Sequence, residues 1–186
     1  ELILYDVDSG TELGSSTCHT NNVCGVGFNS DGSLLVSASE DRHMNVFRVD
    51  NLKKPIHTRN LSGQAQSLAF TPDGSMVAVG HDNGEVAFFN TVNYELIATV
   101  KAHAGHPSRW MRLCFSLNSL PGRMTMATCS LGEHEAKIWD VTHLQSPVLL
   151  HTLTEGHNDD LMAVQFSPDG QVRIIPSPPH RCPFCS

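Results

Sequence analysis

The sequence predicts an all-β fold made of repeated four-stranded antiparallel sheets. Two observations carry this prediction. The pattern Phe-x-x-Asp-Gly recurs at residues 28–32, 70–74 and 166–170, and a spacing of about 40 to 50 residues is typical of repeat architectures. Between these markers, apolar and polar residues alternate in short runs, which indicates strands and not helices.

A second aromatic residue closes a strand in each repeat. These closing residues are Tyr5, Phe47, Phe89 and Trp139. The first two intervals are 42 residues and the third is 50. The extra residues fall in two polar segments, around 105–109 before Phe115 and around 118–123 after it. Because surface loops tolerate added length, we expect both insertions to lie in loops.

Three complete repeats are therefore expected, near residues 23–61, 66–100 and 111–154. We expect strands near 23–29, 34–38, 44–49 and 55–61, then 66–71, 76–80, 85–90 and 95–100, and finally 111–116, 124–130, 136–141 and 149–154. Two half repeats, at 1–18 and 163–175, supply two strands each. Asp31-Gly32 and Asp73-Gly74 are expected to form hairpin turns, since glycine adopts the positive φ that such turns need.

Composition limits the function classes. The chain of 186 residues is 40% hydrophobic and 17% charged, with a formal net charge of -7, so it has the material for a sizeable core. The acidic balance and the lack of a basic run argue against binding to nucleic acid or to anionic membranes. No apolar stretch reaches the length of a membrane span, and the N-terminal residues lack a signal-type pattern.

The cysteines agree with a reducing compartment, and we expect a cytoplasmic or nuclear protein. Cys18, Cys24, Cys114 and Cys129 lie in or beside strand-like segments without the spacing of metal ligands. We interpret them as small hydrophobic residues and not as disulfide partners.

The aromatic markers and their neighbours resemble the WD-repeat β-propeller family over roughly residues 1–175. Trp139-Asp140 is the dipeptide that names the family. Family members also carry a Gly-His pair nine residues before the repeated Phe, and this offset fits His19, His106 and His157. In the second repeat Leu61 occupies the histidine slot. The resemblance implies a propeller of four-stranded blades, with three complete blades and two half blades.

The resemblance also implies a hydrogen-bonded tetrad of His, Ser or Thr, an acidic residue and Trp inside each blade. The tetrad residues carried over to this chain are His19, Ser39, Asp41 and Phe47, together with His106, Glu133, Trp139 and His157. Phe47 has no indole N–H to donate, so we expect a weaker tetrad in the first blade. In the second blade Asn83 stands at the acidic position.

A His-Asp-Ser trio also occurs in hydrolases, so catalysis is an alternative. One such trio in each blade is more consistent with a structural role. The remaining histidines do not form a metal motif, and His103 is expected on the exposed loop before His106. Phosphate-binding glycine loops are absent from the sequence. We therefore expect no cofactor, no resident metal and no catalytic residue.

Both ends of the pattern fall inside a blade. This predicts a partial or truncated ring, and the alternative is that the two half blades combine into a fourth blade that closes a small ring. Residues 176–186 form a separate tail with four prolines, which we expect to be disordered. Cys182 and Cys185, with His180, offer fewer than the four ligands of a structural zinc site, so zinc binding there stays a second possibility.

The function implied by the resemblance is a non-enzymatic scaffold that binds other proteins or peptides within a multiprotein complex. The alternative is a propeller-based enzyme with a polar cluster at its central channel. Exposed blade edges are a further route to self-association. The partner-binding candidates lie on the face that carries the tetrad histidines and are Asn21, Asn22, Arg42, His43, His81, Asp82, Arg109, Trp110 and His134. For Trp110, packing inside the blade is the competing interpretation.

Overall fold

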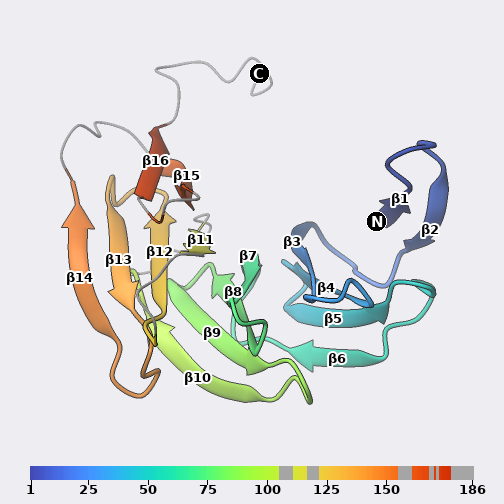
Figure 1. Ribbon diagram of the computed structural model, residues 1–186, viewed down its shortest axis with the longest axis horizontal. Helices are drawn as coiled ribbons and strands as arrows, with labels where there is room; N and C mark the ends of the chain where they lie inside the picture. Colours follow the sequence, from blue (N-terminus) through green and yellow to red (C-terminus); the bar gives the residue numbers. More distant parts are fainter. Residues whose placement is uncertain (105–110, 117–121, 155–160, 168–169, 171, 177–186) are drawn as a thin grey trace.

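The computed structural model describes residues 1–104, 111–116, 122–154, 161–167, 170 and the backbone of 172–176. The described residues form sixteen strands, β1 to β16, and no helix. The strands lie in three four-stranded and two two-stranded antiparallel sheets, stacked side by side along a curved arc (Figure 1). The all-β fold of four-stranded blades is confirmed. No helix long and apolar enough to cross a membrane occurs in the described part of the chain.

The three complete sheets follow one pattern, in which consecutive strands are neighbours. The first contains β3 (Val23–Phe28), β4 (Leu34–Ser39), β5 (His43–Arg48) and β6 (His57–Asn60). The second contains β7 (Ala65–Phe70), β8 (Met76–His81), β9 (Glu85–Asn90) and β10 (Leu96–Lys101). The third contains β11 (Met111–Phe115), β12 (Thr125–Ser130), β13 (Ala136–Asp140) and β14 (Val148–Leu153).

The remaining strands form the two half sheets. They are β1 (Leu2–Tyr5) with β2 (Glu12–Ser16), and β15 (Leu161–Phe166) with β16 (Val172–Pro176). These two pairs are separate sheets at opposite ends of the arc (Figure 1).

Hairpin turns join the first and second strands of the first two complete sheets, as the Asp-Gly pairs predict. Gly32 and Gly74 have φ of 71° and 69°, a conformation that glycine adopts at little cost. The carboxylates of Asp31 and Asp73 accept hydrogen bonds from the backbone N–H groups of Ser33 and Ser75, at 2.8 and 3.1 Å. These side chains fix the two turns locally, so the register of the first hairpin in each of these two sheets follows from the sequence.

Apolar layers between neighbouring sheets form the core. One face of β4 and β5, with Val36 and Val46, packs against the second sheet in a cluster that contains Val77 and Phe89. The other face of the second sheet packs against Met126 and Trp139 of the third in the same way. Smaller clusters join the third sheet to β15 and the first sheet to β1. Every sheet is thus held by its neighbours, which is how repeat proteins gain stability.

Candidate functional site

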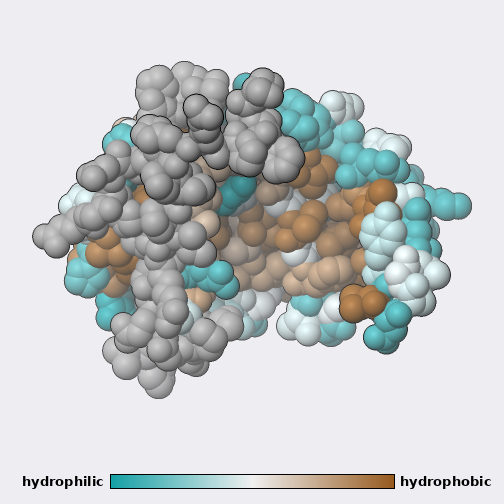
Figure 2. Space-filling view, turned by 90° about the horizontal axis from the view of Figure 1, so that it is seen from above, coloured by the Kyte–Doolittle hydropathy of each residue, from teal (hydrophilic) through white to brown (hydrophobic). Residues whose placement is uncertain are grey.

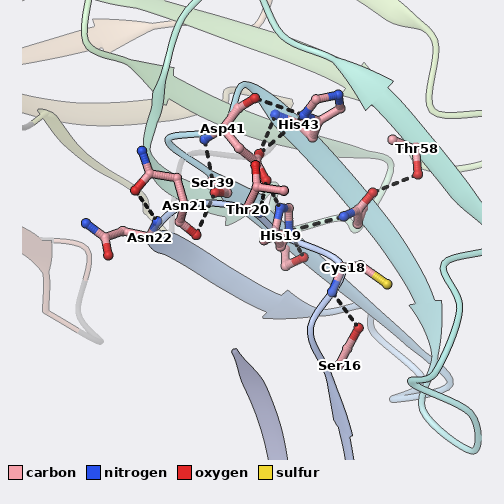
Figure 3. A network of polar contacts seen from close by, with 12 residues as sticks. Ser16, Cys18, His19, Thr20, Asn21, Asn22, Ser39, Asp41, His43 and Thr58 are labelled. Atoms are coloured by element: carbon pink, nitrogen blue, oxygen red, sulfur yellow. Dashed lines mark hydrogen bonds and ion pairs between the residues drawn. The ribbon is translucent and has the colours of Figure 1, made fainter.

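The most connected polar network of the first blade surrounds His19, in the loop between β2 and β3 (Figure 3). Its Nδ1 lies 2.8 Å from a carboxylate oxygen of Asp41, in the turn between β4 and β5. Its Nε2 lies 2.7 Å from the hydroxyl of Ser37 in β4 and 3.3 Å from the amide nitrogen of Asn45 in β5. The His19 side chain is only 2% exposed. The network therefore joins a loop, a turn and two strands at one edge of the blade.

Asp41 is the acceptor at the centre of this network. Because a carboxylate accepts hydrogen bonds, Nδ1 of His19 carries the proton and Nε2 accepts from the Ser37 hydroxyl. Asp41 also accepts from the backbone N–H groups of Thr20 and His43, both at 2.9 Å. Burial by itself raises the pKa of Asp41, but the hydrogen bonds from Thr20, His19 and His43 outweigh it and hold this pKa below 3.8. The carboxylate thus stays charged and fixes both loops.

The third blade repeats this arrangement around His103. Its Nδ1 donates to Glu133 at 2.6 Å, and its Nε2 lies 3.0 Å from the hydroxyl of Thr128 in β12. The indole N–H of Trp139 donates to the same hydroxyl at 3.2 Å. A continuous chain of donors therefore runs from Trp139 through Thr128 and His103 to Glu133, and such chains strengthen each bond.

Burial and hydrogen bonding set the protonation of this second network. The His103 side chain is fully buried, and burial lowers the pKa of its imidazole below 6.5, so the ring is neutral. For Glu133, burial raises the pKa, but hydrogen bonds from His103, the Ala104 backbone and Lys137 lower it from 4.5 to about 2. Glu133 is therefore an anion at neutral pH, held by three donors.

The second blade lacks the network. Val79 of β8 pairs with Ala87 as Ser37 pairs with Asn45 in the first blade, so an apolar side chain replaces the hydroxyl. Val79 shares an apolar cluster with Leu61, the residue that stands at the histidine position of the family pattern in this blade. The nearby loop is held differently, since Asp82 accepts a hydrogen bond from the Gln64 backbone at 3.0 Å.

These networks have the connectivity of an acid, a histidine and a hydroxyl, as in serine hydrolases. In that mechanism the hydroxyl oxygen attacks a substrate and must therefore be accessible. Ser37 and Thr128 are both 0% exposed. Their hydroxyls lie inside the blades, where they complete a hydrogen-bond chain, and the same arrangement occurs on two blades. This geometry suits the fastening of loops to strands.

The structure corrects parts of the predicted tetrads. Ser37, and not Ser39, contacts His19, because the Ser39 hydroxyl donates to the Asn21 carbonyl at 3.3 Å. Phe47 is buried in the apolar cluster between the first sheet and β1.

In the third blade, where His106 was the predicted tetrad histidine, His103 contacts Glu133 and Thr128, and Thr128 also accepts a hydrogen bond from Trp139. The expectation that His103 lies on an exposed loop is therefore wrong, since only 2% of the residue is exposed. His106 and His157 lie outside the described residues.

The partner-binding candidates fall into three groups. Asn21, Asn22, Arg42 and His134 are exposed, and His43 is partly exposed, on the loops that flank the two networks. Asp82 is half-buried and is engaged in holding its own loop. Arg109 and Trp110 lie outside the described residues, so both interpretations of Trp110 stay open.

His81 is not a surface residue, which corrects its assignment as a partner-binding candidate. It is 1% exposed, because it ends β8 and pairs there with Ala65 of the inner strand. Its Nδ1 lies 3.1 Å from the Ser62 hydroxyl, while its Nε2 has no hydrogen-bond partner among the described residues. A signal for this burial existed, because His81 stands eight residues before Phe89, as the buried Ser39 does before Phe47.

A small open cavity of about 230 Å³ adjoins the first network. Its lining residues are Cys18, Thr20, Asp41, His43, Asn45, Pro55 and Thr58. Both carboxylate oxygens of Asp41 already accept hydrogen bonds, and the Thr58 hydroxyl donates to Asn45 at 2.7 Å. The cavity is therefore a polar depression in the loop face with few free hydrogen-bonding groups.

One cluster has the ligand types of a metal site. Ligand atoms of His103, Glu133 and Glu135 lie within 4.8 Å of one another. The ammonium group of Lys137 lies 3.2 Å from Glu133 and 2.8 Å from Glu135, between the two carboxylates. This cation offsets one of the two carboxylate charges, and Nδ1 of His103 carries a proton that it donates to Glu133, so it offers no lone pair to a metal. The donor set therefore does not fit a resident metal ion.

Acidification is expected to destabilise the chain through its buried histidines. Burial lowers the pKa of His81 and of His103 below 6.5 in the folded chain. At acidic pH the unfolded state therefore binds protons that the folded state does not bind. The contribution of these two neutral rings to the free energy of unfolding is at its full value above pH 6.5 and decreases as the pH falls below that value. Each group changes the free energy of unfolding by at most about 1.4 kcal/mol per pH unit.

The check is thermal melting at a series of pH values between about 7.5 and 5.5, the range in which an unperturbed imidazole titrates. The variant His81→Leu should lose less of its melting temperature over this range than the parent chain. His151→Leu, at an exposed position, should follow the parent. An unchanged slope in His81→Leu would show that the pKa of His81 does not differ between the folded and unfolded states, and would contradict this prediction.

Comparisons with known proteins agree with this architecture. Residues 26–118, half of the chain, match the family model described as "Anaphase-promoting complex subunit 4 WD40 domain". Residues 147–175 match the model described as "WD domain, G-beta repeat". A chain in the crystal structure of the mitotic checkpoint complex superimposes with a TM-score of 0.74 over 90% of this chain and 50% of that chain. At 19% identity, this likeness shows the fold alone.

Curated relatives are longer proteins. Apoptotic protease-activating factor 1 of Homo sapiens is 27% identical over 177 residues, which cover 92% of this chain and 13% of that protein. Small ribosomal subunit protein RACK1y of Oryza sativa subsp. japonica is 30% identical over 146 residues, 77% of this chain and 40% of the relative. Periodic tryptophan protein 2 homolog of Schizosaccharomyces pombe is 31% identical over 90 residues, 48% of this chain and 10% of the relative. The chain thus spans less than half of each of these proteins.

Proposed function

The chain belongs to the WD-repeat family, and on that premise we propose that it is a non-enzymatic platform that binds other proteins within a multiprotein complex. The binding surface is the loop face, defined by the loop between β2 and β3 and the turns β4–β5 and β12–β13. Asn21, Asn22, Arg42, His43 and His134 present their side chains there.

The observation that carries this proposal is that the histidine networks hold these loops against the strands of the blades. The Asp41 carboxylate holds Thr20 on one side and His43 on the other. Glu133 holds Ala104 and His103 in the same way, at 2.8 and 2.6 Å. A loop that is already ordered loses little conformational entropy on binding, which favours affinity.

The turns of the loop face have a backbone that projects side chains outward. Arg42 and His134 have φ of 65° and 51° and are exposed. Non-glycine residues with this conformation are uncommon and deserve a functional explanation. Arginine is also among the residue types that most often anchor protein interfaces. Arg42 is therefore the residue that we expect to contribute most to partner binding.

Charge and the names of relatives support a protein partner. A net charge of -7 opposes the electrostatic attraction on which nucleic-acid binding depends. The matching family model and the superimposed structure are described as parts of the anaphase-promoting complex and of the mitotic checkpoint complex. Membership in an assembly of the cytoplasm or nucleus is the corresponding proposal for this chain.

Affinity capture with matched variants tests the proposal. Arg42→Glu reverses the charge on the loop face, whereas Val92→Glu places the same side chain in the turn β9–β10 on the opposite face, where Val92 is 87% exposed. We expect the parent and Val92→Glu to recover one set of partners by quantitative mass spectrometry. Arg42→Glu should recover these partners at least about tenfold less, the effect of roughly 1.4 kcal/mol in binding.

Melting temperatures of all three proteins provide the control, and we expect them to agree closely because both sites are exposed. Equal recovery of partners by Arg42→Glu and the parent would contradict the proposed surface. Turnover of a substrate that survives both variants and is lost on mutation of Ser37 would favour the enzyme alternative instead.

A further inference from the structure

His81 is a polar exception in the buried part of the chain. Apolar side chains gather at the centre of the molecule in Figure 2, yet His81 is only 1% exposed. It is two residues from Val79 in β8 and so lies on the same face of the strand, toward the first sheet. Nδ1 of its ring lies 3.1 Å from the Ser62 hydroxyl, and Nε2 has no hydrogen-bond partner among the described residues. A buried nitrogen without a partner is unfavourable.

The other two complete sheets have serine at this position. His81, Ser39 and Ser130 each lie opposite the first residue of the inner strand of their own sheet. A serine side chain stays uncharged throughout the physiological pH range, whereas an imidazole takes up a proton at about pH 6.5. The second sheet therefore has an ionisable side chain at a buried position where the other two have none.

The loop that packs on His81 consists of residues 61–64 and connects β6 of the first sheet to β7 of the second (Figure 1). A Cβ added to Gly63 would lie 3.1 Å from the Cβ of His81, so the loop backbone is in direct contact with this side chain. Two backbone N–H groups join the loop to the turn between β8 and β9. The Gln64 N–H donates to the Asp82 carboxylate, and the Asp82 N–H donates to the Gln64 carbonyl, both at 3.0 Å.

The ring of His81 has no carboxylate to balance a positive charge, unlike the ring of His103. Nδ1 of His103 donates to Glu133 at 2.6 Å, so a second proton on that ring would complete an ion pair. Nδ1 of His81 faces the neutral hydroxyl of Ser62. When His81 is protonated, both ring nitrogens are donors. The buried position would then hold a charge and an N–H group without an acceptor, which is costly.

The charged groups around His81 do not offset this cost. Burial has the largest influence and lowers the pKa of the imidazole below 6.5, although Glu85 and Asp82 attract a proton. The loop 61–64 and β7 contain no ionisable side chain. The ammonium group of Lys101 in β10 donates to the backbone of the β8–β9 turn at 2.7 Å, and its charge opposes protonation. The adjoining turn of the first sheet carries Glu40, Asp41, Arg42 and His43.

We propose that His81 acts as a pH-sensitive switch for the loop 61–64: when its ring is protonated, the ring leaves its buried position and the loop separates from the turn between β8 and β9. An imidazole in water takes up a proton at about pH 6.5, so the open form binds a proton that the closed form does not bind. Because protons bind the open form preferentially, acid shifts the equilibrium toward it.

The released loop adjoins the turn that carries Arg42. The backbone N–H of Leu61 donates to the Arg42 carbonyl at 2.8 Å, so opening of the loop removes a contact beneath this exposed residue. Acid would then weaken partner binding at the loop face, a consequence that rests on the proposed function. The opening of the loop itself depends only on His81 and its surroundings.

Amide hydrogen exchange, followed by nuclear magnetic resonance from about pH 7.5 to about pH 5.5, tests the switch. The protection factor compares each amide with an unstructured peptide at the same pH. At Gln64 and Asp82 it should fall by up to about tenfold over this range. The amide of Val79 in β8 should be much better protected at every pH, because the loop opens while the sheet stays folded. Constant protection at Gln64 and Asp82, or protection equal to that of Val79, would overturn the proposal.

Two variants identify His81 as the group that titrates. His81→Leu keeps an apolar side chain at the position, and His81→Ser supplies the residue that the other two sheets have there. In both, the protection at Gln64 and Asp82 should no longer depend on pH, whatever the overall stability of the variant. His151→Leu, at an exposed position, should keep the response of the parent. An acid response that persists in the His81 variants would overturn the proposal. No partner takes part in this measurement, so its outcome is independent of the proposed function.

Discussion

Replacing His103 with alanine is expected to lower the free energy of unfolding by about 3 kcal/mol, because the buried Thr128 hydroxyl and the half-buried Glu133 carboxylate each lose a hydrogen-bond partner. Thr128 loses the acceptor of its hydroxyl proton, and Glu133 loses its shortest hydrogen bond, at 2.6 Å. The side chain of His103 is fully buried, so its removal also leaves a cavity. Urea unfolding of the parent and the variant measures the difference.

Two further variants separate the network from simple packing. Thr128→Ser keeps the hydroxyl and should cost clearly less than Thr128→Val, which keeps the shape of the side chain and removes the hydroxyl. His151→Ala, at an exposed position of β14, should leave stability almost unchanged. Equal costs for Thr128→Ser and Thr128→Val would contradict a stabilising role for the hydrogen-bond chain.

Gly25→Val is expected to be equally damaging, by about 3 kcal/mol, because it forces two blades apart. A Cβ at Gly25 would lie 2.6 Å from the Cβ of Leu68 and 2.7 Å from its backbone nitrogen. Backbone atoms cannot move aside as the end of a flexible side chain can. The junction between β3 and β7 must therefore open or shift, and chemical denaturation should show a large loss of stability.

Gly14 provides the matched control. A Cβ at Gly14 would lie 3.8 Å from Leu52, an ordinary contact distance, so Gly14→Ala should change the free energy of unfolding by less than about 0.5 kcal/mol. If Gly25→Val were tolerated as well as Gly14→Ala, the blades would not be packed as described.

Much of the fold could be predicted because its signals are local. The Asp-Gly turns and the alternating pattern specify hairpins within a few residues of the chain. The predicted bounds of strands with a weaker pattern were less accurate. The strand expected at 55–61, for example, is β6 at His57–Asn60. An edge strand has one solvent-exposed side, so its ends depend on packing that the sequence pattern does not display.

The networks were predicted less well, because they depend on contacts between distant parts of the chain. The nine-residue offset that identifies His19 fails for His103, which stands twelve residues before Phe115. The three inserted residues of this repeat lie between the histidine and the strand, so the histidine keeps its place while the count changes. The presence of His103 three residues before His106 was a signal, but spacing alone did not decide between them.

The choice between Ser37 and Ser39 illustrates the same limit. Both residues belong to β4, are two positions apart and so lie on the same face of the strand. Only the depth at which the His19 ring enters the blade determines which hydroxyl it meets. That depth follows from the loop between β2 and β3, which Asp41 holds from a distant turn through His19 and Thr20.

The central claim is that the hydrogen bonds of the buried histidines His19 and His103 hold the loop face against the blades. Nuclear magnetic resonance of the imidazole protons tests it most directly. At neutral pH we expect the Nδ1–H protons of His19 and His103 to exchange slowly with solvent and His103 to be uncharged, while the ring of the exposed His151 exchanges rapidly. Rapid exchange at His103, or a charged His103 ring at pH 7, would contradict the account.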